Sequence, residues 1–334
     1  MGFVSTQHGA QKFMKVTRFC PAKVNLFLEV TGKRPNGYHE LATLFAKISL
    51  GDTLIVSARP AEKTTLSLQL TGPFAPRIEP DENNLVCRAA RAFLEHFNLN
   101  AEVELQLDKH IPTGAGLGGG SSDAAHTLLA LCQIFQKNKT ELLPAAAKLG
   151  ADVPLFMYDD TFLKGEGIGE RLTPIRPGDG PLPYLVLVYP NTVVPTAGVF
   201  ARLTLPTKEN ILTNTANLDK LVEYLRCTAP LSDWKHLLFN RLEGCVVPFT
   251  NSVRNALLAL KTNTDAVLMS GSGSSVFALV ETEKDARKLI EKLQSPQRTV
   301  VLTTFYRSST HENNGDKDTS YGRGSSEGVC QCDI

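Results

Sequence analysis

A glycine-rich segment at residues 112–126 constrains this chain more than any other feature. It reads Pro-Thr-Gly-Ala-Gly-Leu-Gly-Gly-Gly-Ser-Ser-Asp-Ala-Ala-His, and good helix formers follow it as far as Phe135. Glycines let the backbone come close to a ligand, and the start of a helix presents N–H groups that attract phosphate. The segment therefore predicts a nucleotide triphosphate held by a loop and a helix N-terminus.

Three known phosphate-binding patterns do not fit this segment. The Gly-Lys-Ser/Thr ending of a Walker loop is absent from the chain. Gly114, Gly116 and Gly119 match the dinucleotide fingerprint, but no acidic residue ends a second strand about 20 positions further on. The protein-kinase tripeptides His-Arg-Asp and Asp-Phe-Gly are missing as well. Close packing of glycines at a helix start is the remaining alternative.

Composition narrows the class of protein and its partners. The chain has 334 residues, enough for one large or two medium domains, and its net charge of +1 creates no general field for nucleic acid. No apolar run approaches the roughly 18 residues of a membrane span. The seven cysteines lack any Cys-x-x-Cys pair, which suits a reducing compartment. We expect a cytoplasmic protein with a small-molecule substrate and neither nucleic acid nor membrane as partner; the oligomeric state stays open.

Hydrophobic periodicity predicts a series of strands and helices along the chain. Strands are expected at 16–30, 47–57, 64–69, 101–107, 161–164, 169–175, 184–189, 266–269, 275–280 and 298–304. Helices are expected at 83–97, after the glycine-rich segment, and at 141–149, 196–203, 216–226, 239–247, 251–261 and 283–294. A linker rich in Pro and Gly at 174–183 separates domains at 15–175 and 184–307. A flexible extension at 1–14 and a polar, disordered tail at 308–334 complete the chain.

Three motifs resemble those of the superfamily of galactokinase, homoserine kinase, mevalonate kinase and phosphomevalonate kinase. They are the glycine-rich segment, Pro-Ala-Lys-Val-Asn-Leu at 21–26 and Met-Ser-Gly-Ser-Gly-Ser-Ser at 269–275. Further motifs at 33–41, 149–154 and 165–170 resemble the members that phosphorylate 4-diphosphocytidyl-2-C-methyl-D-erythritol. The resemblance implies an α+β fold of two domains. The N-terminal domain would be ribosomal-protein-S5-like and the C-terminal domain ferredoxin-like, with the active site between them.

The resemblance also implies an activity. An enzyme of this kind uses ATP to phosphorylate the 2-hydroxyl of the cytidine diphosphate-linked methylerythritol, in the non-mevalonate pathway to isoprenoid precursors. Mg²⁺ would arrive as the ATP complex. No cluster of acidic residues marks a dedicated metal site, so the metal ligands stay unassigned. The alternatives are another kinase of the superfamily, acting on a mevalonate or homoserine, and a catalytically inactive nucleotide-binding protein.

Asp152 and Lys23 are the candidate catalytic residues. Asp152 lies in a Gly-Ala-Asp-Val-Pro corner, where it fits equally well a general base for a hydroxyl or a helix N-cap. Lys23 lies in an apolar strand, either as an edge lysine facing water or as an ammonium paired with a carboxylate. The resemblance implies that Asp152 is the base and that Lys23 pairs with it and orients the hydroxyl.

The resemblance assigns the remaining binding residues. For ATP they are Asn84, Lys109, Pro112, Gly114, Gly116, Gly118, Gly119, Gly120, Ser121 and Ser122. For the substrate they are Asn25, Tyr38, His39, Thr196 and Phe200, with His39 and Phe200 on the two sides of the cytosine. The residues alone also allow Asn84 as a helix cap, Lys109 as a surface charge and Tyr38 and His39 as ordinary loop residues. We further expect Gly119 to need positive φ.

Overall fold

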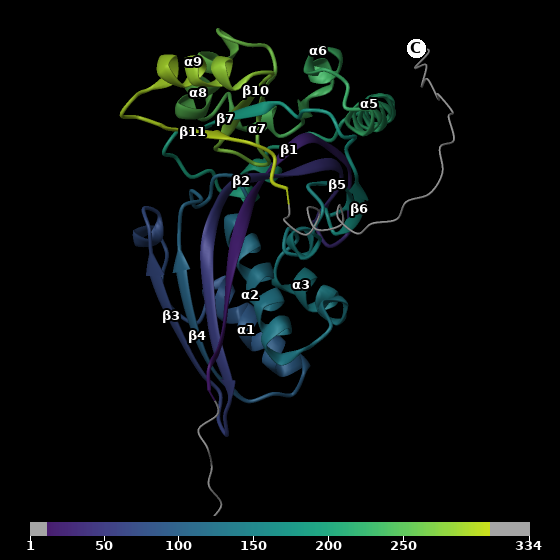
Figure 1. Cartoon of the computed structure of the whole chain (residues 1–334). Helices are drawn as coiled ribbons and strands as arrows, with labels where there is room; N and C mark the ends of the chain where they lie inside the picture. Colours follow the sequence, from purple (N-terminus) through teal and green to yellow (C-terminus); the bar gives the residue numbers. More distant parts are fainter. Residues whose placement is uncertain (1–11, 308–334) are drawn as a thin grey trace, which may run out of the picture.

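A computed structural model describes residues 12–307, which form two β-sheets with helices packed on them (Figure 1). The predicted tail at 308–334 lies outside the described residues. So does nearly all of the predicted extension at 1–14, although the first strand already begins at Met14. The segment 176–183 contains no helix or strand, and the domain limits placed on either side of it remain predictions.

The first sheet has seven strands and carries three helices on one face (Figure 1). Burial alternates along residues 65–71 and 101–108, as expected where a sheet has one face against helices. In spatial order the strands are β3 (Thr65–Thr71), β4 (Ala101–Asp108), β2 (His39–Pro60), β1 (Met14–Lys33) and β8 (Phe239–Asn240), while β5 (Phe162–Gly167) joins β2 to β6 (Arg171–Ile175). The helices are α1 (Leu85–His96), α2 (Gly119–Phe135) and α3 (Leu143–Leu149).

The second half of β1 runs through the centre of the molecule. Residues 20–30 are all buried, and successive side chains enter three different apolar clusters. This strand has packed elements on both faces, because α2 covers one and the C-terminal domain covers the other. Any polar side chain in it must therefore find a partner inside the protein.

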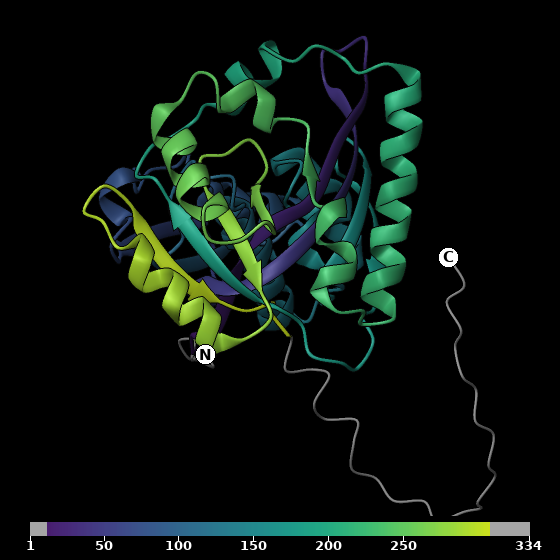
Figure 2. The same ribbon diagram turned by 90° about the horizontal axis from the view of Figure 1, so that it is seen from above.

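The second sheet has four strands, and every neighbouring pair is antiparallel. Its spatial order is β11 (Thr299–Thr303), β7 (Tyr184–Tyr189), β10 (Val276–Val280) and β9 (Val267–Met269), which in chain order is 4-1-3-2. With helices between the first and second and after the third of its strands, this is the ferredoxin-like arrangement. The helices are α4 (Thr196–Ala201), α5 (Lys208–Arg226), α6 (Leu231–Trp234), α7 (Glu243–Val246), α8 (Asn251–Lys261) and α9 (Glu283–Leu293). Figure 2 shows this domain from above, lying over the first sheet.

Two predicted helices differ from the structure. The helix expected at 239–247 is wrong for its first turn, because Phe239 and Asn240 pair in parallel with β1 and only Glu243–Val246 is helical. That pairing is a contact with a distant strand, which local periodicity does not reveal. The helix expected at 216–226 begins earlier, at Lys208, where the Thr207 side chain caps it.

None of the helices in residues 12–307 is both long enough and apolar enough to cross a bilayer. The longest, Lys208–Arg226, carries charged side chains along its length and buries only one stripe of residues, consisting of Leu218, Leu221, Val222 and Leu225. That stripe packs against the first sheet beside β1 and β2. It therefore helps to join the two domains.

Candidate active site

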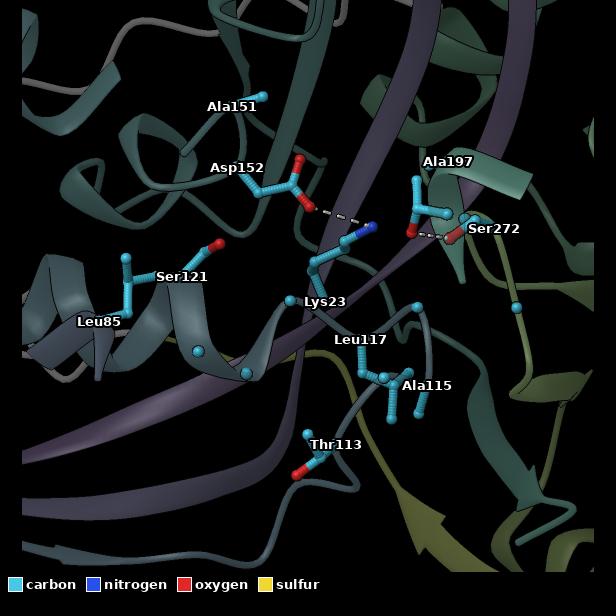
Figure 3. A pocket seen from close by; sticks show the side chains of 18 of the residues that line it. Lys23, Leu85, Thr113, Ala115, Leu117, Ser121, Ala151, Asp152, Ala197 and Ser272 are labelled. Atoms are coloured by element: carbon cyan, nitrogen blue, oxygen red, sulfur yellow. Dashed lines mark hydrogen bonds and ion pairs between the residues drawn. The ribbon is translucent and has the colours of Figure 1, made fainter. Parts of the chain in front are cut away.

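A cavity of about 1270 Å³ lies where the first sheet, the start of α2 and the C-terminal domain meet (Figure 3). Both domains line it. The N-terminal side contributes β1, the turn before β2, the start of α1 and residues 111–121, and the C-terminal side contributes α4 and residues 271–273. The volume exceeds the range of about 300–1,000 Å³ that is usual for a single ligand, so two substrates can be held side by side.

Residues 112–118, here called the glycine loop, form one wall of this cavity. Gly114, Gly116 and Gly118 have φ of +65°, +75° and +70°, a region that favours glycine. Three successive carbonyls of the loop accept hydrogen bonds from the protein: Ala115 from Ser275 N–H at 3.1 Å, Gly116 from the Ser270 hydroxyl at 3.0 Å, and Leu117 from Lys23 N–H at 2.9 Å. A loop that turns its carbonyls into the protein presents its N–H groups on the other side, as anion sites require.

Helix α2 begins directly after the glycine loop, with Gly118 as its N-cap. Gly119 is helical, so the expectation of positive φ at Gly119 is wrong. A Cβ there would still be crowded, because it would lie 2.9 Å from Ile111 Cγ2. Gly120 has no atom within 4 Å of an added Cβ and borders the cavity, as does Ser121. The first turn of α2 therefore opens onto the place where the loop's N–H groups converge.

Ser122 does not lie where the sequence placed it. It is fully buried, it is not among the residues that line the cavity, and its hydroxyl lies 3.5 Å from Nδ1 of His126. One position along a helix turns a side chain by about 100°, so neighbouring serines at 121 and 122 face different surroundings. The structure gives the Ser122 hydroxyl no access to the cavity, and the predicted contact of Ser122 with ATP stays a prediction.

Lys23 and Asp152 point toward one another across the cavity (Figure 3). Lys23 Nζ lies 3.5 Å from Asp152 Oδ2, and it donates a hydrogen bond of 2.8 Å to Asn25 Oδ1. Asn25 is held in turn, since its Nδ2 donates to the Thr43 hydroxyl at 2.8 Å. The Lys23 side chain is buried, whereas the Asp152 side chain is 34% exposed. The buried ammonium is thus fixed on one side and leaves the carboxylate accessible to a ligand.

Asp152 is not a helix cap. The short 3₁₀ helix that follows, Pro154–Met157, has Val153 at its N-cap position and no side-chain hydrogen bond to its first turn. The sequence left two interpretations of Asp152 open, a general base and a helix cap. The structure excludes the cap. It directs the carboxylate toward an ammonium in a cavity, which is the geometry that a base role requires.

Lys109 lies between two buried carboxylates. Its Nζ contacts Asp52 and lies 2.6 Å from Asp123 Oδ2, and all three side chains are almost wholly buried. The other oxygen of Asp52 accepts the backbone N–H groups of His110 and Ile111, at the entrance to the glycine loop. Burial and the nearby Asp52 raise the pKa of Asp123, which the Lys109 ammonium partly offsets.

Lys109 is therefore a buried ion-pair partner and not a surface charge. Sequence reasoning missed both of its partners, Asp52 and Asp123. Asp52 follows the first half of β2 and Asp123 lies inside α2, so no local pattern joins them to Lys109. Lys109 also borders the cavity, so the predicted contact with the adenine side of ATP stays a prediction. Its ammonium already has two anionic partners, which limits that contact to its remaining hydrogen and its methylene groups.

Asn84 acts as the N-cap of α1. Its side-chain oxygen accepts the Val86 N–H at 3.2 Å, and its amide nitrogen donates to the Glu79 carbonyl at 3.2 Å. The cap that the sequence allowed is therefore present. Asn84 also lines the cavity, and its predicted contact with ATP stays a prediction. Pro112 lines the same cavity at the start of the glycine loop.

The residues expected to hold a cytosine come together from both domains. The His39 ring, at the start of β2, stacks on the Phe200 ring of α4 with centroids 4.9 Å apart and planes 23° from parallel. Burial, and to a lesser extent Lys33, lower the pKa of His39. Tyr38 is 59% exposed beside it, and the Thr196 hydroxyl lies 2.8 Å from that of Ser272. The two rings contact each other directly, with no space for a base between them.

Asn240 is a positioning residue that the sequence did not reveal. It is buried, and its side-chain nitrogen donates to the carbonyls of Met269 and Gly271 at 2.7 and 2.8 Å. These bonds hold residues 270–275 against the glycine loop. A Cβ on Gly271 would lie 3.2 Å from Lys23 Nζ, so this loop approaches the ammonium closely. The wrong helix prediction at 239–247 concealed this role.

Among residues 12–307 no group of three or more His, Cys, Asp or Glu side chains is arranged to hold a metal ion. Because phosphate oxygens and water satisfy most of the coordination of Mg²⁺ in nucleotide complexes, a kinase does not need such a cage. No residue is therefore assigned as a metal ligand.

Comparison with known proteins relates this site to a family of kinases. The family model of the GHMP kinases N terminal domain matches residues 84–160, and that of the GHMP kinases C terminal domain matches residues 217–298. A protein of Cupriavidus metallidurans named 4-diphosphocytidyl-2-C-methyl-D-erythritol kinase is 37% identical over 82% of this chain and 88% of its own. A protein of Chlorobium luteolum with the same name is 39% identical over 81% and 91%.

Solved structures agree with these relatives. The crystal structure of 4-(cytidine 5'-diphospho)-2C-methyl-D-erythritol kinase matches with a TM-score of 0.68 and 34% identity, over 86% of this chain and 99% of that one. Homoserine kinase from Cytophaga hutchinsonii matches with a TM-score of 0.69 but only 19% identity, which shows the fold alone. The predicted α+β fold with two domains is confirmed. The chain belongs to the GHMP kinases, which are ATP-dependent, and within them to the family of the 4-diphosphocytidyl-2-C-methyl-D-erythritol kinases.

Proposed function

We propose that this protein transfers the γ-phosphoryl group of ATP to the 2-hydroxyl of 4-diphosphocytidyl-2-C-methyl-D-erythritol, in the non-mevalonate route to isoprenoid precursors. One observation carries the proposal. The Lys23–Asp152 pair lies in a single cavity with the glycine loop on one side and the His39–Phe200 aromatic pair on the other. A phosphate donor and a base-bearing acceptor can therefore meet at the carboxylate.

Asp152 acts as the general base in this proposal. Phosphoryl transfer passes through a loose transition state, so catalysis depends on positioning and on the neutralisation of charge. The Asp152 carboxylate accepts the proton of the 2-hydroxyl as the new P–O bond forms, and the bond to the leaving ADP breaks. Lys23 orients the carboxylate and the hydroxyl, and its hydrogen bond to Asn25 fixes the ammonium for this task. Asn25 contacts the substrate beside the reacting hydroxyl.

The glycine loop and the first turn of α2 bind the triphosphate. The N–H side of the loop, the helix dipole and the Ser121 hydroxyl all favour an anion there. Asn84 and Lys109 border the end of the cavity that would receive the adenosine. Mg²⁺ bound to ATP would neutralise charge on the phosphates.

Tyr38, His39, Thr196 and Phe200 bind the cytidine part of the acceptor. An aromatic pair suits a flat base, whereas mevalonate and homoserine carry no ring that could use it. This is why the cytidyl acceptor is favoured over the acceptors of other GHMP kinases. The pair is built by two domains, which makes the base site dependent on their assembly.

The experiment combines the purified protein with ATP and each candidate acceptor. With the cytidyl methylerythritol, ³¹P NMR should show ADP and a phosphomonoester on the 2-hydroxyl. Mevalonate and homoserine serve as matched acceptors and should give neither. Turnover of either one without turnover of the cytidyl compound would refute the substrate assignment and leave the kinase activity intact.

A cytosolic location completes the proposal. Four of the described cysteines, Cys20, Cys87, Cys132 and Cys245, are buried free thiols. Burial raises the pKa of the Cys20 thiol well above its usual value, which keeps it protonated and unreactive. Such thiols, and the need for ATP, suit a reducing compartment. Fractionation of the source cells with an antibody against the protein tests the location.

A further inference from the structure

One motif takes no part in the chemistry described so far. Residues 165–170, Gly-Glu-Gly-Ile-Gly-Glu, form the end of β5 and the turn that leads to β6. Gly167 has φ of +72°, and a Cβ there would lie 2.4 Å from an oxygen of Glu170. That same oxygen, Oε2, accepts the N–H of Ile168. The turn is thus folded around the Glu170 carboxylate, which fixes the direction of this side chain.

The other carboxylate oxygen of Glu170 faces Arg34. Arg34 Nη2 lies 3.4 Å from Glu170 Oε1, and Arg34 Nε donates to Glu40. The guanidinium holds the pKa of the Glu40 carboxyl below its usual value. One planar cation therefore joins two carboxylates, one beside it in the β1–β2 hairpin and one on a separate turn, as arginine is suited to do.

Arg34 also closes the hairpin that carries the base-site residues. Its backbone N–H donates to the Tyr38 carbonyl at 2.7 Å, and its carbonyl accepts the N–H of Gly37 at 3.0 Å. The preceding residue, Lys33, lies opposite His39 in the β1–β2 register. Fixing the Arg34 side chain therefore restricts the backbone of the turn that carries Tyr38 and leads to His39. The two turns are close neighbours, because Leu41 of β2 pairs with Gly167 of β5.

We propose that Glu170, acting through Arg34, is a positioning residue that fixes the 34–38 turn and thereby the His39 side of the base site. The identity of the base rests on the proposed function, whereas the anchoring of the turn rests on contacts alone. All three charged side chains are about one-third exposed, so the ion pairs contribute little to global stability. Their effect is on the local order of a short turn.

The test substitutes Glu170→Gln. Glutamine keeps the length of the side chain and an acceptor for the Ile168 N–H, and it removes the negative charge that faces Arg34. We expect KM for the cytidyl substrate to rise about two- to five-fold, the range set by a partly exposed ion pair. The turnover number, KM for ATP and the melting temperature should stay unchanged. Hydrogen exchange of the 34–38 amides, measured without substrate, should become faster.

The same turn provides a matched control. Glu166 makes only a long ion pair, with its Oε2 3.9 Å from Arg171 Nη2, and both side chains are mostly exposed. Glu166→Gln removes the same charge from the same motif and should leave both KM and exchange unchanged. Arg34→Met, which removes the ion pairs with both Glu40 and Glu170, should have a larger effect than Glu170→Gln on both KM and exchange.

Each contrary outcome overturns a separate statement. Unchanged exchange at 34–38 in Glu170→Gln, or equal changes in Glu166→Gln, would refute the anchor. Faster exchange with an unchanged KM would refute the link from the anchor to the base site. Failure of the unmodified protein to phosphorylate the cytidyl substrate would refute the proposed function, while the exchange measurement would still decide the anchor.

Discussion

The carboxylate of Asp152 faces an ammonium that the protein has already fixed through Asn25. Asp152→Asn keeps the size of the side chain and removes the proton acceptor. We expect turnover to fall by about 10²–10⁴-fold, the usual contribution of a positioned base, with little change in ATP affinity or melting temperature. Steady-state kinetics and calorimetric titration with ATP measure the two quantities separately.

Asp159→Asn is the control for that substitution. This carboxylate lies in the same stretch of chain, pairs with Lys139 at 3.0 Å and is mostly exposed. Its loss should leave turnover unchanged, because exposed ion pairs contribute little. Normal turnover in Asp152→Asn would exclude the base role. Lys23→Ala should lower turnover more than it lowers ATP affinity. Weaker ATP binding with normal turnover at saturating ATP would mean that Lys23 is a phosphate ligand instead.

His39 tests the specificity of the site. His39→Ala should raise KM for the cytidyl substrate by about ten- to a hundred-fold and spare ATP, using the stacking energy of roughly 1–3 kcal/mol per base known from nucleic-acid binders. Phe200→Ala should act in the same direction. If the two rings hold one base, the double variant should be non-additive. Phe249→Ala, at an exposed aromatic of the same domain as Phe200, serves as control.

At the scale of elements, substitutions at Gly116 and Gly120 distinguish an effect on packing from an effect on ligand binding. A Cβ at Gly116 would lie 2.2 Å from the Ser270 carbonyl and would need positive φ, so Gly116→Ala should lower the melting temperature. A Cβ at Gly120 meets no protein atom within 4 Å and projects from the first turn of α2. Gly120→Ala should therefore keep or raise the melting temperature, since alanine favours helices.

The same Gly120→Ala variant should bind ATP more weakly, by about ten-fold, because the new methyl group would meet the triphosphate. Thermal melts with and without ATP read both effects in one experiment, and the ATP-dependent stabilisation should shrink. An undiminished ATP shift in Gly120→Ala would mean that the triphosphate does not lie over the start of α2.

Elements with local signals were predictable from the sequence, and those that depend on distant partners were not. The glycine loop and α2 carry their own pattern of glycines and helix formers, and they form as expected. The wrong turn of helix at 239–247 arose because pairing with β1 outweighs local propensity. The second carboxylate beside Lys109 comes from β2, more than fifty positions away. Such partners appear only when the chain is folded.

At the scale of the whole molecule, stability should depend on the charge state of His126. Its Nδ1–H donates to the Ser122 carbonyl at 2.8 Å, and burial lowers its pKa to about 4. In the unfolded chain the pKa is about 6.5, so below that pH the unfolded state binds more protons. The free energy of unfolding should therefore fall as the pH falls from 6.5 toward 4, by at most about 1.4 kcal/mol per pH unit.

His126→Gln isolates this effect, because glutamine does not titrate. The advantage of the unmodified protein over the variant should shrink between pH 7 and pH 5, as measured by denaturant unfolding at both pH values. The comparison is needed because Asp123 acts in the opposite sense: its raised pKa costs stability as the pH rises. A difference that stays constant with pH would mean that the pKa of His126 is the same in the folded and the unfolded protein.

The two domains complete each other's loops. The carbonyls of Ala115 and Gly116 are satisfied by Ser275 and Ser270 of the C-terminal domain, while Lys23 of β1 satisfies Leu117. A loop held from both sides keeps its shape before ATP arrives, which lowers the cost of ordering it on binding. The phosphate site is therefore a property of the assembled molecule, and neither half of the chain contains it alone.

In the free enzyme the His39 and Phe200 rings stack on each other, so their contact competes with the stacking of a substrate base between them. A base inserted between them needs two stacking gaps of about 3.5 Å each, or about 7 Å in all, whereas the ring centroids are 4.9 Å apart. The rings must separate, and a stacked pair contributes about 0.5–1.5 kcal/mol that a ligand has to exceed. If cytosine lies between the two rings as proposed, part of its stacking energy is used to separate them, so the measured affinity for the cytidyl acceptor should be lower than its stacking contacts alone would give.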